Sequence, residues 1–252
     1  MQSEKQYIDL YLEAQQLIKQ HAAPVLNEVR DKAFEDFRRQ GFPTKKVERY
    51  KYTDMQKLFE PDYGLNLNRL EIPVNPYETF KCDVPNLSTS LYFIVNDQFY
   101  TKALPNVKLN EGVIVDSLNH VAMEQPELVK KYYGKLANTE KDAVTALNTM
   151  LAQDGLFIYV PKHVQLDRTV QIINILRSDV DLMVNRRVLI VLEEGAKAQF
   201  LFCDHAADDQ NFLATQVIEA FVGDNASLEL NCMEETHAKN VRVSNVYIEQ
   251  QR

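Results

Sequence analysis

The sequence contains no tryptophan, only three cysteines and only seven glycines among its 252 residues. The cysteines, Cys82, Cys203 and Cys232, are far apart and odd in number. They therefore exclude a disulfide framework and indicate a reducing compartment. The glycines are too widely spaced to form the glycine-rich loop that cradles nucleotide phosphates, so we do not expect this chain to be an ATPase.

Long apolar runs are also missing, and none approaches the roughly 18 residues that a membrane-spanning helix needs. The first residues open a charged amphipathic stretch instead of the apolar core of a signal peptide. We therefore expect a cytoplasmic protein. The chain has 36 acidic and 28 basic residues, a net charge of −8, which argues against non-specific binding to nucleic acid.

From Asp154 onward the chain consists of short runs rich in Val, Ile, Leu and Phe, with no helical pattern between them. Matching turns at 161–164, 193–196 and 223–226 separate these runs, and they recur at a period of about 30 residues, within the range of repeat architectures. The third positions of the turns hold His163, Gly195 and Asn225, residue types that accept positive φ. This period predicts a parallel β-helix, with an antiparallel sandwich as the alternative.

The residues before Asp154 divide into two parts. Residues 1–85 carry apolar stripes at helical spacing, which predict a helical hairpin that packs on itself and not on a membrane surface, followed by an extended linker. Residues 86–153 contain a predicted β-hairpin, 91–95 with 99–104, and two helices, 126–133 and 141–152. We thus expect an N-terminal helical domain (1–85), a mixed segment (86–153) and an incomplete β-helix core (154–252).

A basic and aromatic segment follows the predicted helical hairpin. In it, two tyrosines interleave with five basic residues: Lys45, Lys46, Arg49, Tyr50, Lys51, Tyr52 and Lys57. The composition is compatible with stacking on nucleic acid bases. A single such cluster in an acidic chain favours a connector instead, whose aromatic rings anchor it to a core while the basic stems lie across the surface.

Several segments together resemble the SufB/SufD family of iron–sulfur cluster assembly proteins, and its SufD branch in particular. They are residues 41–54, 146–148, 154–162, 188–196 and 244–250. The first has the family's glycine, apolar residue, Pro-Thr and basic pair, and it ends in Tyr-Lys-Tyr-Thr-Asp with Tyr50 where tryptophan is common. The resemblance covers nearly the whole chain, and the order and spacing of the segments make it specific.

The resemblance implies an N-terminal helical domain, a single-stranded right-handed parallel β-helix core and a C-terminal helical domain. It also implies a non-catalytic scaffold that pairs with SufB, acts with the SufC ATPase and assembles or transfers clusters. No cofactor is expected on this chain, although an iron–sulfur cluster or iron can be held transiently in the full complex.

Family members run on beyond the position of Arg252, so we expect a truncated core that lacks the SufC-binding part. Such a core would have unpaired strand edges, through which a homodimer could form. We expect neither nucleic acid nor membrane as a partner.

Candidate metal ligands gather at two places about one repeat apart: Cys203, Asp204 and His205, then Cys232, Glu234, Glu235 and His237. The offset of 29 from Cys203 to Cys232 would stack the two thiols on adjacent coils, and thiolate and imidazole suit iron. We favour the competing interpretation, in which both cysteines are small apolar lumen residues and the others lie in solvated loops. We therefore assign no catalytic, cofactor-binding or metal residue. His21, His120 and His163 each stand alone, and Cys82 lies in the linker.

Two other functions stay open. Parallel β-helices also occur in polysaccharide lyases and glycosidases, where clustered carboxylates do acid/base work. The candidates would be Glu193, Glu194, Asp224, Glu234 and Glu235, which lie mainly at predicted turns. The second alternative is a protein-interaction module with no link to clusters.

Overall fold

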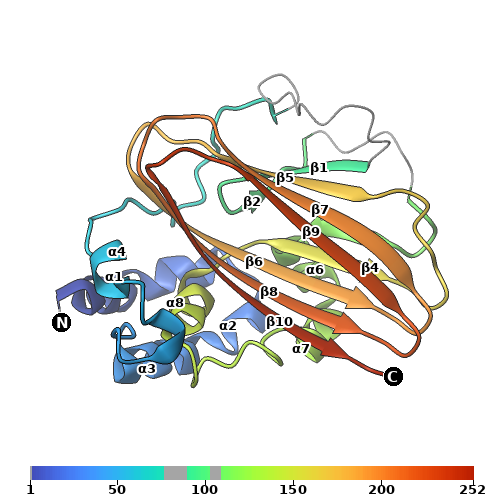
Figure 1. The fold of residues 1–252 in the computed structure, drawn as a ribbon, viewed down its shortest axis with the longest axis horizontal. Helices are drawn as coiled ribbons and strands as arrows, with labels where there is room; N and C mark the ends of the chain where they lie inside the picture. Colours follow the sequence, from blue (N-terminus) through green and yellow to red (C-terminus); the bar gives the residue numbers. More distant parts are fainter. Residues whose placement is uncertain (1, 77–89, 103–108) are drawn as a thin grey trace.

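The computed structural model describes residues 2–76, 90–102 and 109–252, and it combines a helical layer with two five-stranded sheets (Figure 1). The helices are α1 (Gln2–Gln20), α2 (Pro24–Asn27), α3 (Arg30–Gln40), η1 (Glu48–Tyr50), α4 (Met55–Leu58), α6 (Leu118–Glu124), α7 (Pro126–Tyr132) and α8 (Ala143–Leu151). The strands are β1 (Ser90–Val95), β2 (Gln98–Phe99), β3 (Ile114–Ser117), β4 (Leu156–Val160), β5 (Val170–Leu176), β6 (Leu182–Leu192), β7 (Lys197–Ala206), β8 (Phe212–Val222), β9 (Ser227–Glu235) and β10 (Asn240–Gln250). None of the helices in these ranges is both long enough and apolar enough to cross a bilayer.

The N-terminal helices pack on each other through their apolar stripes, as predicted for a helical hairpin. The ring of Tyr11 on α1 stacks on that of Phe34 on α3, with 4.6 Å between centroids. Both rings share one buried cluster with Leu147 of α8 and with Met183 and Leu213 on the strands. The helical layer therefore covers the outer face of the sheet that contains β6 and β8.

The strands alternate between the two sheets along the chain, and their neighbours within each sheet are mostly parallel. The sheet orders are β2-β1-β5-β7-β9 and β10-β8-β6-β4-β3. Val170 lies opposite Phe200 and Leu182 opposite Phe212, both at an offset of 30, whereas β4 pairs with β6 at an offset of 32 and β8 with β10 at 28. This arrangement is a parallel β-solenoid, which confirms the predicted β-helix and excludes the antiparallel sandwich.

The repeated turns form one stacked corner of the solenoid. His163, Gly195 and Asn225 have φ values of 62°, 68° and 56°, which confirms the predicted left-handed position in each turn. Backbone hydrogen bonds join consecutive turns: His163 N donates to Glu194 O at 2.8 Å, and Gly195 N donates to Asp224 O at 2.8 Å. A side chain at Gly195 would meet the imidazole of His163 in the preceding turn, since an added Cβ would lie 2.5 Å from Nδ1.

The lumen between the sheets is filled mainly by apolar side chains that point inward at alternate positions. The central cluster takes Ile158 from β4, Ile190 from β6, Phe200 from β7 and Ile218 from β8, and all four are fully buried. On β9, Leu228 and Leu230 pack against this cluster while the intervening residues are exposed. Strand β9 therefore has one apolar face toward the lumen and one face toward solvent.

The predicted hairpin in the mixed segment is also confirmed, because β1 pairs with β2 in antiparallel fashion across Asn96 and Asp97. Residues 103–104 of its expected second strand lie outside the described residues, as do Cys82 and the rest of 77–85 in the expected linker. Strand β1 also pairs in parallel with β5, so one sheet begins well before Asp154. The helices expected at 126–133 and 141–152 correspond to α7 and α8.

We predict that Gly195→Val lowers the free energy of unfolding by about 1–3 kcal/mol, because a β-branched residue is strained at this φ and would also collide with His163. Urea denaturation followed by circular dichroism measures the effect. Asn225→Gly is the matched control, since glycine keeps the left-handed conformation of the next corner, and it should shift the midpoint little. An unchanged midpoint for Gly195→Val would refute the corner assignment.

Candidate functional site in the solenoid lumen

A layer of polar side chains interrupts the apolar lumen at matching positions of successive coils. Asn174, Asp204 and Glu234 lie side by side in one sheet, and Arg186 lies beside Gln216 in the other. All five positions have the same parity as the inward-facing residues of their strands, so they face the lumen. The repeat thus places polar groups in rows inside an otherwise apolar core.

A chain of four charges links the two sheets across this layer. Arg186 Nη1 pairs with Asp204 Oδ1, and Arg242 Nη1 donates to Asp204 Oδ2 at 2.7 Å. Arg242 Nε then lies 2.6 Å from Glu234 Oε1. The side chains of Arg186 and Asp204 are only 2% and 3% exposed, so this pair lies where an uncompensated charge would be costly. The four charges cancel.

Both carboxylate oxygens of Asp204 are engaged in structural contacts, because each accepts a hydrogen bond from a different guanidinium group. Arg186 Nε also donates to Asn96 O at 2.9 Å, which ties the turn of the β1–β2 hairpin to the lumen. A carboxylate held in this way links three elements and has no free oxygen with which to act as a general base.

The layer also contains buried polar atoms that have no hydrogen-bond partner among the described residues. They are Nδ2 and Oδ1 of Asn174, Nη2 of Arg186, Oε1 of Gln216, and both amide atoms of Asn240. A cavity of about 120 Å³ adjoins Arg186 and Asn240, and Asp204, Glu234 and Arg242 line it with them. Unpaired groups of this kind are uncommon in buried regions and mark the layer as the candidate site.

Cys232 lies at the rim of this layer, on the lumen side of β9 opposite Phe202. The residue as a whole is exposed, yet partial burial of the thiol raises the pKa of Cys232, an effect that the charge of Arg242 opposes. The thiol form is therefore favoured, and a thiol is a weaker metal ligand than a thiolate.

The structure excludes the alternative in which Cys203 stacks on Cys232. Strands β7 and β9 pair at an offset of 30, not 29, so Cys203 lies opposite Met233. A difference of one residue places two side chains on opposite faces of a sheet. Cys203 is fully buried in a small outer cluster with Phe93 and Ile173, while Cys232 lies opposite the lumen residue Phe202. The favoured interpretation, that both cysteines are lumen residues, is therefore wrong for Cys203. It is also wrong for Asp204, which is buried in strand β7 and not in a solvated loop.

The histidines do not gather around either cysteine. His205 Nδ1 lies 3.2 Å from Glu235 Oε2, and His237 Nε2 lies 2.7 Å from the carbonyl oxygen of Asp208. His120 pairs with Asp116 and, together with His21, lines a separate cavity of about 600 Å³. Within residues 2–76, 90–102 and 109–252, no three His, Cys, Asp or Glu side chains are arranged to hold a metal ion.

The outer face of β6 carries a second buried ion pair, which fixes the helical layer to the solenoid. Arg187 Nη2 donates to Glu219 Oε2 at 2.6 Å, and both side chains are essentially unexposed. The Glu219 carboxylate also accepts backbone N–H groups from Gly134, Leu136 and Ala137 at 2.8–3.0 Å. The loop after α7 is therefore bound to the sheet by one carboxylate.

The basic and aromatic segment anchors to the same framework through Asp142. Tyr50 Oη and Arg49 Nη2 donate to Asp142 Oδ2 at 2.7 and 2.6 Å, and Asn245 of β10 donates to the other oxygen at 2.8 Å. Tyr52, in contrast, is 91% exposed. The connector interpretation is thus confirmed for Tyr50, whereas Tyr52 anchors nothing within the described part of the chain.

Patterns of metal ligands and carboxylates in the sequence do not indicate four polar residues of the lumen: Arg186, Arg242, Asn174 and Gln216. The signal was nevertheless present, since Asn174, Asp204 and Glu234 recur with the same period as the turns. Polar residues that repeat in phase with the inward positions of a solenoid indicate a polar layer in the lumen.

Comparison with known proteins adds independent information. Residues 1–172 match the family model described as the SufBD protein N-terminal region, and residues 174–252 match the SufBD core domain of SUF system FeS cluster assembly. The two matches follow each other in chain order and cover nearly every residue.

Individual proteins of this family match the chain at modest sequence identity. The chain is 31% identical over 129 residues to an iron–sulfur cluster assembly SufBD family protein of Synechocystis, a match that covers 51% of this chain and 27% of that protein. It is 26% identical over 171 residues to an Arabidopsis thaliana SufBD family protein (68% and 35% covered). It is 28% identical over 156 residues to iron–sulfur cluster assembly protein SufD of Bacillus subtilis (58% and 34% covered). The matches thus span about a third or less of the length of these relatives.

We predict that the double substitution Cys203→Ala and Cys232→Ala leaves the iron content of the protein unchanged after anaerobic incubation with ferrous iron and sulfide. The two thiols face opposite sides of their sheet and cannot coordinate the same iron, and a single thiol should not retain iron by itself. Iron is measured by colorimetric assay after gel filtration. A lower iron content in a double variant that is still folded would show that the cysteines are ligands.

We predict that His205 contributes to a loss of stability below neutral pH. Burial lowers the pKa of His205 below its usual 6.5, so the unfolded state binds the proton more readily, and stability decreases as the pH falls below about 6.5. Urea midpoints at pH 7.5 and 5.5 should therefore differ less for His205→Gln than for the parent chain.

A histidine with the opposite shift provides the control. The hydrogen bond with Asp116 raises the pKa of His120, so this group stabilises the folded state below about pH 6.5 and the gain is lost as the pH rises through its folded pKa. His120→Gln should enlarge the decrease in midpoint between pH 7.5 and 5.5. Identical pH dependence in all three proteins would contradict both assignments.

Proposed function

The chain belongs to the SufBD family, and from this we propose that it is a SufD-like, non-catalytic scaffold for iron–sulfur cluster assembly. In this proposal it pairs with SufB and acts with the SufC ATPase in the cytoplasm, and the cluster is cargo that the complex builds or transfers. The observation that carries the proposal is the ordered match of both family regions along the chain.

The arrangement of charged groups supports a scaffold in preference to an enzyme. Asp204 is saturated by two guanidinium groups, and Glu219 by one guanidinium and three backbone N–H groups. These buried charges hold the hairpin, the solenoid and the helical layer in fixed relation, which suits a platform for other subunits.

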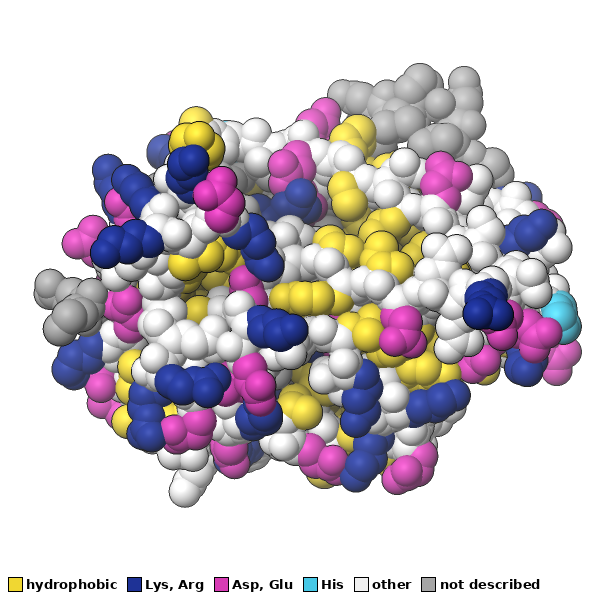
Figure 2. Space-filling model, turned by 60° about the horizontal axis from the view of Figure 1, so that its bottom comes forward, with side chains coloured by type: hydrophobic (Ala, Val, Ile, Leu, Met, Phe, Trp, Pro, Cys, Tyr) yellow, Lys and Arg dark blue, Asp and Glu magenta, His cyan; other side chains and the backbone are white. Residues whose placement is uncertain are grey.

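Strand β10 presents apolar side chains at one end of the solenoid. Val246 and Ile248 are 48% and 55% exposed, at positions that continue the inward rows of Ile218 and Ala220. Figure 2 shows hydrophobic side chains exposed between charged ones on one face of the molecule. A long edge strand with exposed apolar side chains is suited to adding another strand. Because the relatives are about three times as long as their matches to this chain, the strand that covers this edge can come from the same protein, and the proposed pairing with SufB does not rest on it.

The positions of the carboxylates count against a polysaccharide-active enzyme. Glu193, Glu194 and Asp224 lie in the stacked corner, whereas Glu234 and Glu235 lie at the far end of β9. Strand β9 has 9 residues, and a strand of that length separates the groups by roughly 25 Å or more at ~3.3 Å per residue. Glycosidases need their two carboxyl groups within about 5–9.5 Å, so no catalytic pair can form between the corner and the far end of β9. The carboxylates that lie near one another are engaged by other groups: Glu194 pairs with Lys162 Nζ at 3.1 Å, Glu193 accepts from Tyr132 and Tyr159, and Glu234 pairs with Arg242.

We predict that co-expression with SufB and SufC from the same genome yields a complex that contains this chain and SufB and that transfers a cluster to an apo-ferredoxin. Size-exclusion chromatography with light scattering measures the complex, and visible circular dichroism follows the transfer. Failure to bind SufB would exclude the pairing. A complex without cluster transfer would leave a protein-interaction module, and cleavage of an acidic polysaccharide would support the enzyme.

A further inference from the structure

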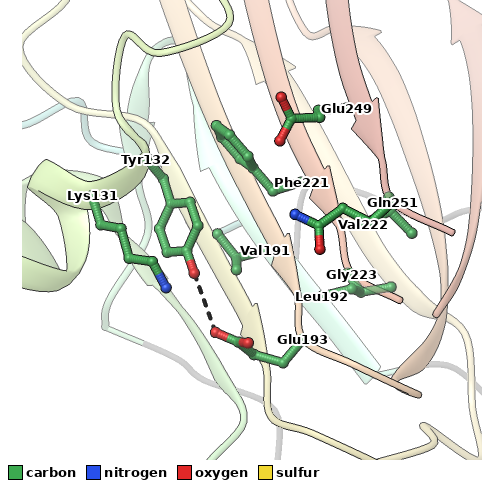
Figure 3. A pocket seen from close by; sticks show the side chains of 10 residues that line it. All are labelled: Lys131, Tyr132, Val191, Leu192, Glu193, Phe221, Val222, Gly223, Glu249 and Gln251. Atoms are coloured by element: carbon green, nitrogen blue, oxygen red, sulfur yellow. Dashed lines mark hydrogen bonds between the residues drawn. The ribbon is translucent and has the colours of Figure 1, made fainter. Parts of the chain in front are cut away.

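A pocket of about 340 Å³ lies outside the lumen, between the end of α7 and the outer face of β6, β8 and β10 (Figure 3). Its floor is apolar and consists mainly of Val191 and Phe221. The ring of Tyr132 lies 4.9 Å from that of Phe221, centroid to centroid, so the two aromatic side chains form one wall and part of the floor. The lumen layer contributes no residue to this pocket.

Carboxylates dominate the polar rim of the pocket. Glu193 accepts hydrogen bonds from the hydroxyl groups of Tyr132 at 3.1 Å and Tyr159 at 3.4 Å. Glu249 lies on the β10 side, and its exposed carboxylate has no hydrogen-bond or ion-pair partner among the described residues. Lys131 is the cation of the lining, and its ammonium group lies over the ring of Tyr132, 4.7 Å from the centroid. The rim therefore carries one net negative charge.

We propose that this pocket receives an arginine side chain from a partner protein. The aliphatic stem would lie on Val191, and the planar guanidinium would stack on Phe221 with its N–H groups directed at Glu249 and Glu193. Arginine matches the site better than lysine, because a planar cation can stack on an aromatic floor and bind a carboxylate with two parallel hydrogen bonds.

The same features exclude other ligand classes. An acidic side chain would meet Glu193 and Glu249, and an apolar side chain would bury the charge of Glu249 without a partner. Tyr132 is already oriented by its hydrogen bond to Glu193, so the aromatic wall is formed before the ligand arrives. The inference concerns a contact of residues 131–251 with an arginine and does not require that the partner be SufB or SufC.

The test is an NMR titration of the isotope-labelled chain with N-acetyl-arginine methylamide, compared with the neutral isostere N-acetyl-citrulline methylamide. We expect the arginine probe to shift the backbone amide signals of Phe221, Gly223 and Gln251 in a saturable, salt-sensitive way. The citrulline probe should bind at least about three- to five-fold more weakly, the factor expected for an exposed ion pair.

Three variants make the outcome specific. Glu249→Gln should weaken binding of the arginine probe by about three- to five-fold and abolish the preference over citrulline. Phe221→Ala should weaken binding of both probes, whereas Glu127→Gln, which removes an exposed charge from α7 outside the pocket, should weaken binding of neither. Equal affinity for both probes, shifts confined to other residues, or binding of N-acetyl-glutamate methylamide at the same signals would each overturn the proposal. Arginine binding without SufB pairing would leave this inference standing while the proposed function failed.

Discussion

The hydrogen bonds that stack the corners at His163, Gly195 and Asn225 are the constraint on which the rest of the molecule depends. Each corner needs a residue that tolerates positive φ, and each donates its N–H to the segment that follows it in the stack. Because the corners are in register, the strands of successive coils lie side by side, and their inward positions coincide. The lumen packing, the polar layer and the attachment of the helices all follow from that alignment.

The parts of the fold that could be predicted from the sequence are those that short stretches of neighbouring residues specify. The turn residues, the apolar runs and the helical stripes are short-range patterns, and they led to the solenoid, the hairpin and the helical layer. The pairing of β1 with β5 could not be predicted in this way. Ser90 lies opposite Val170, far along the chain, and nothing in the sequence of either strand specifies the other strand as its partner. Pairings of this kind are decided by global packing.

The candidate site was harder to predict than the fold, and for a physical reason. Assigning a side chain to the lumen or to the outer face requires the register to be correct within one residue, and the offset of 29 between Cys203 and Cys232 fails that test by one. The buried arginines were overlooked because Arg is almost never fully buried unless it is paired. Their partners, Asp204 and Glu219, lie on later strands and become visible only in three dimensions.

Arg186 and Arg187 are consecutive on β6, and one points into the lumen while the other points at the helices. During folding, a slip of β6 by a single residue would exchange the two faces of the strand. A slip in one direction would put Val188 in the place of Arg187, and Glu219 would be buried with no cation beside it, at a cost of about 3–5 kcal/mol. A slip in the other direction would put Arg186 beside Glu219, but Asn185 would then take the place of Arg186 and Asp204 would lose one of its two guanidinium partners. The two consecutive arginines therefore destabilise coils that are out of register by one residue. A purely apolar strand, similar on both faces, would not discriminate between the two registers in this way.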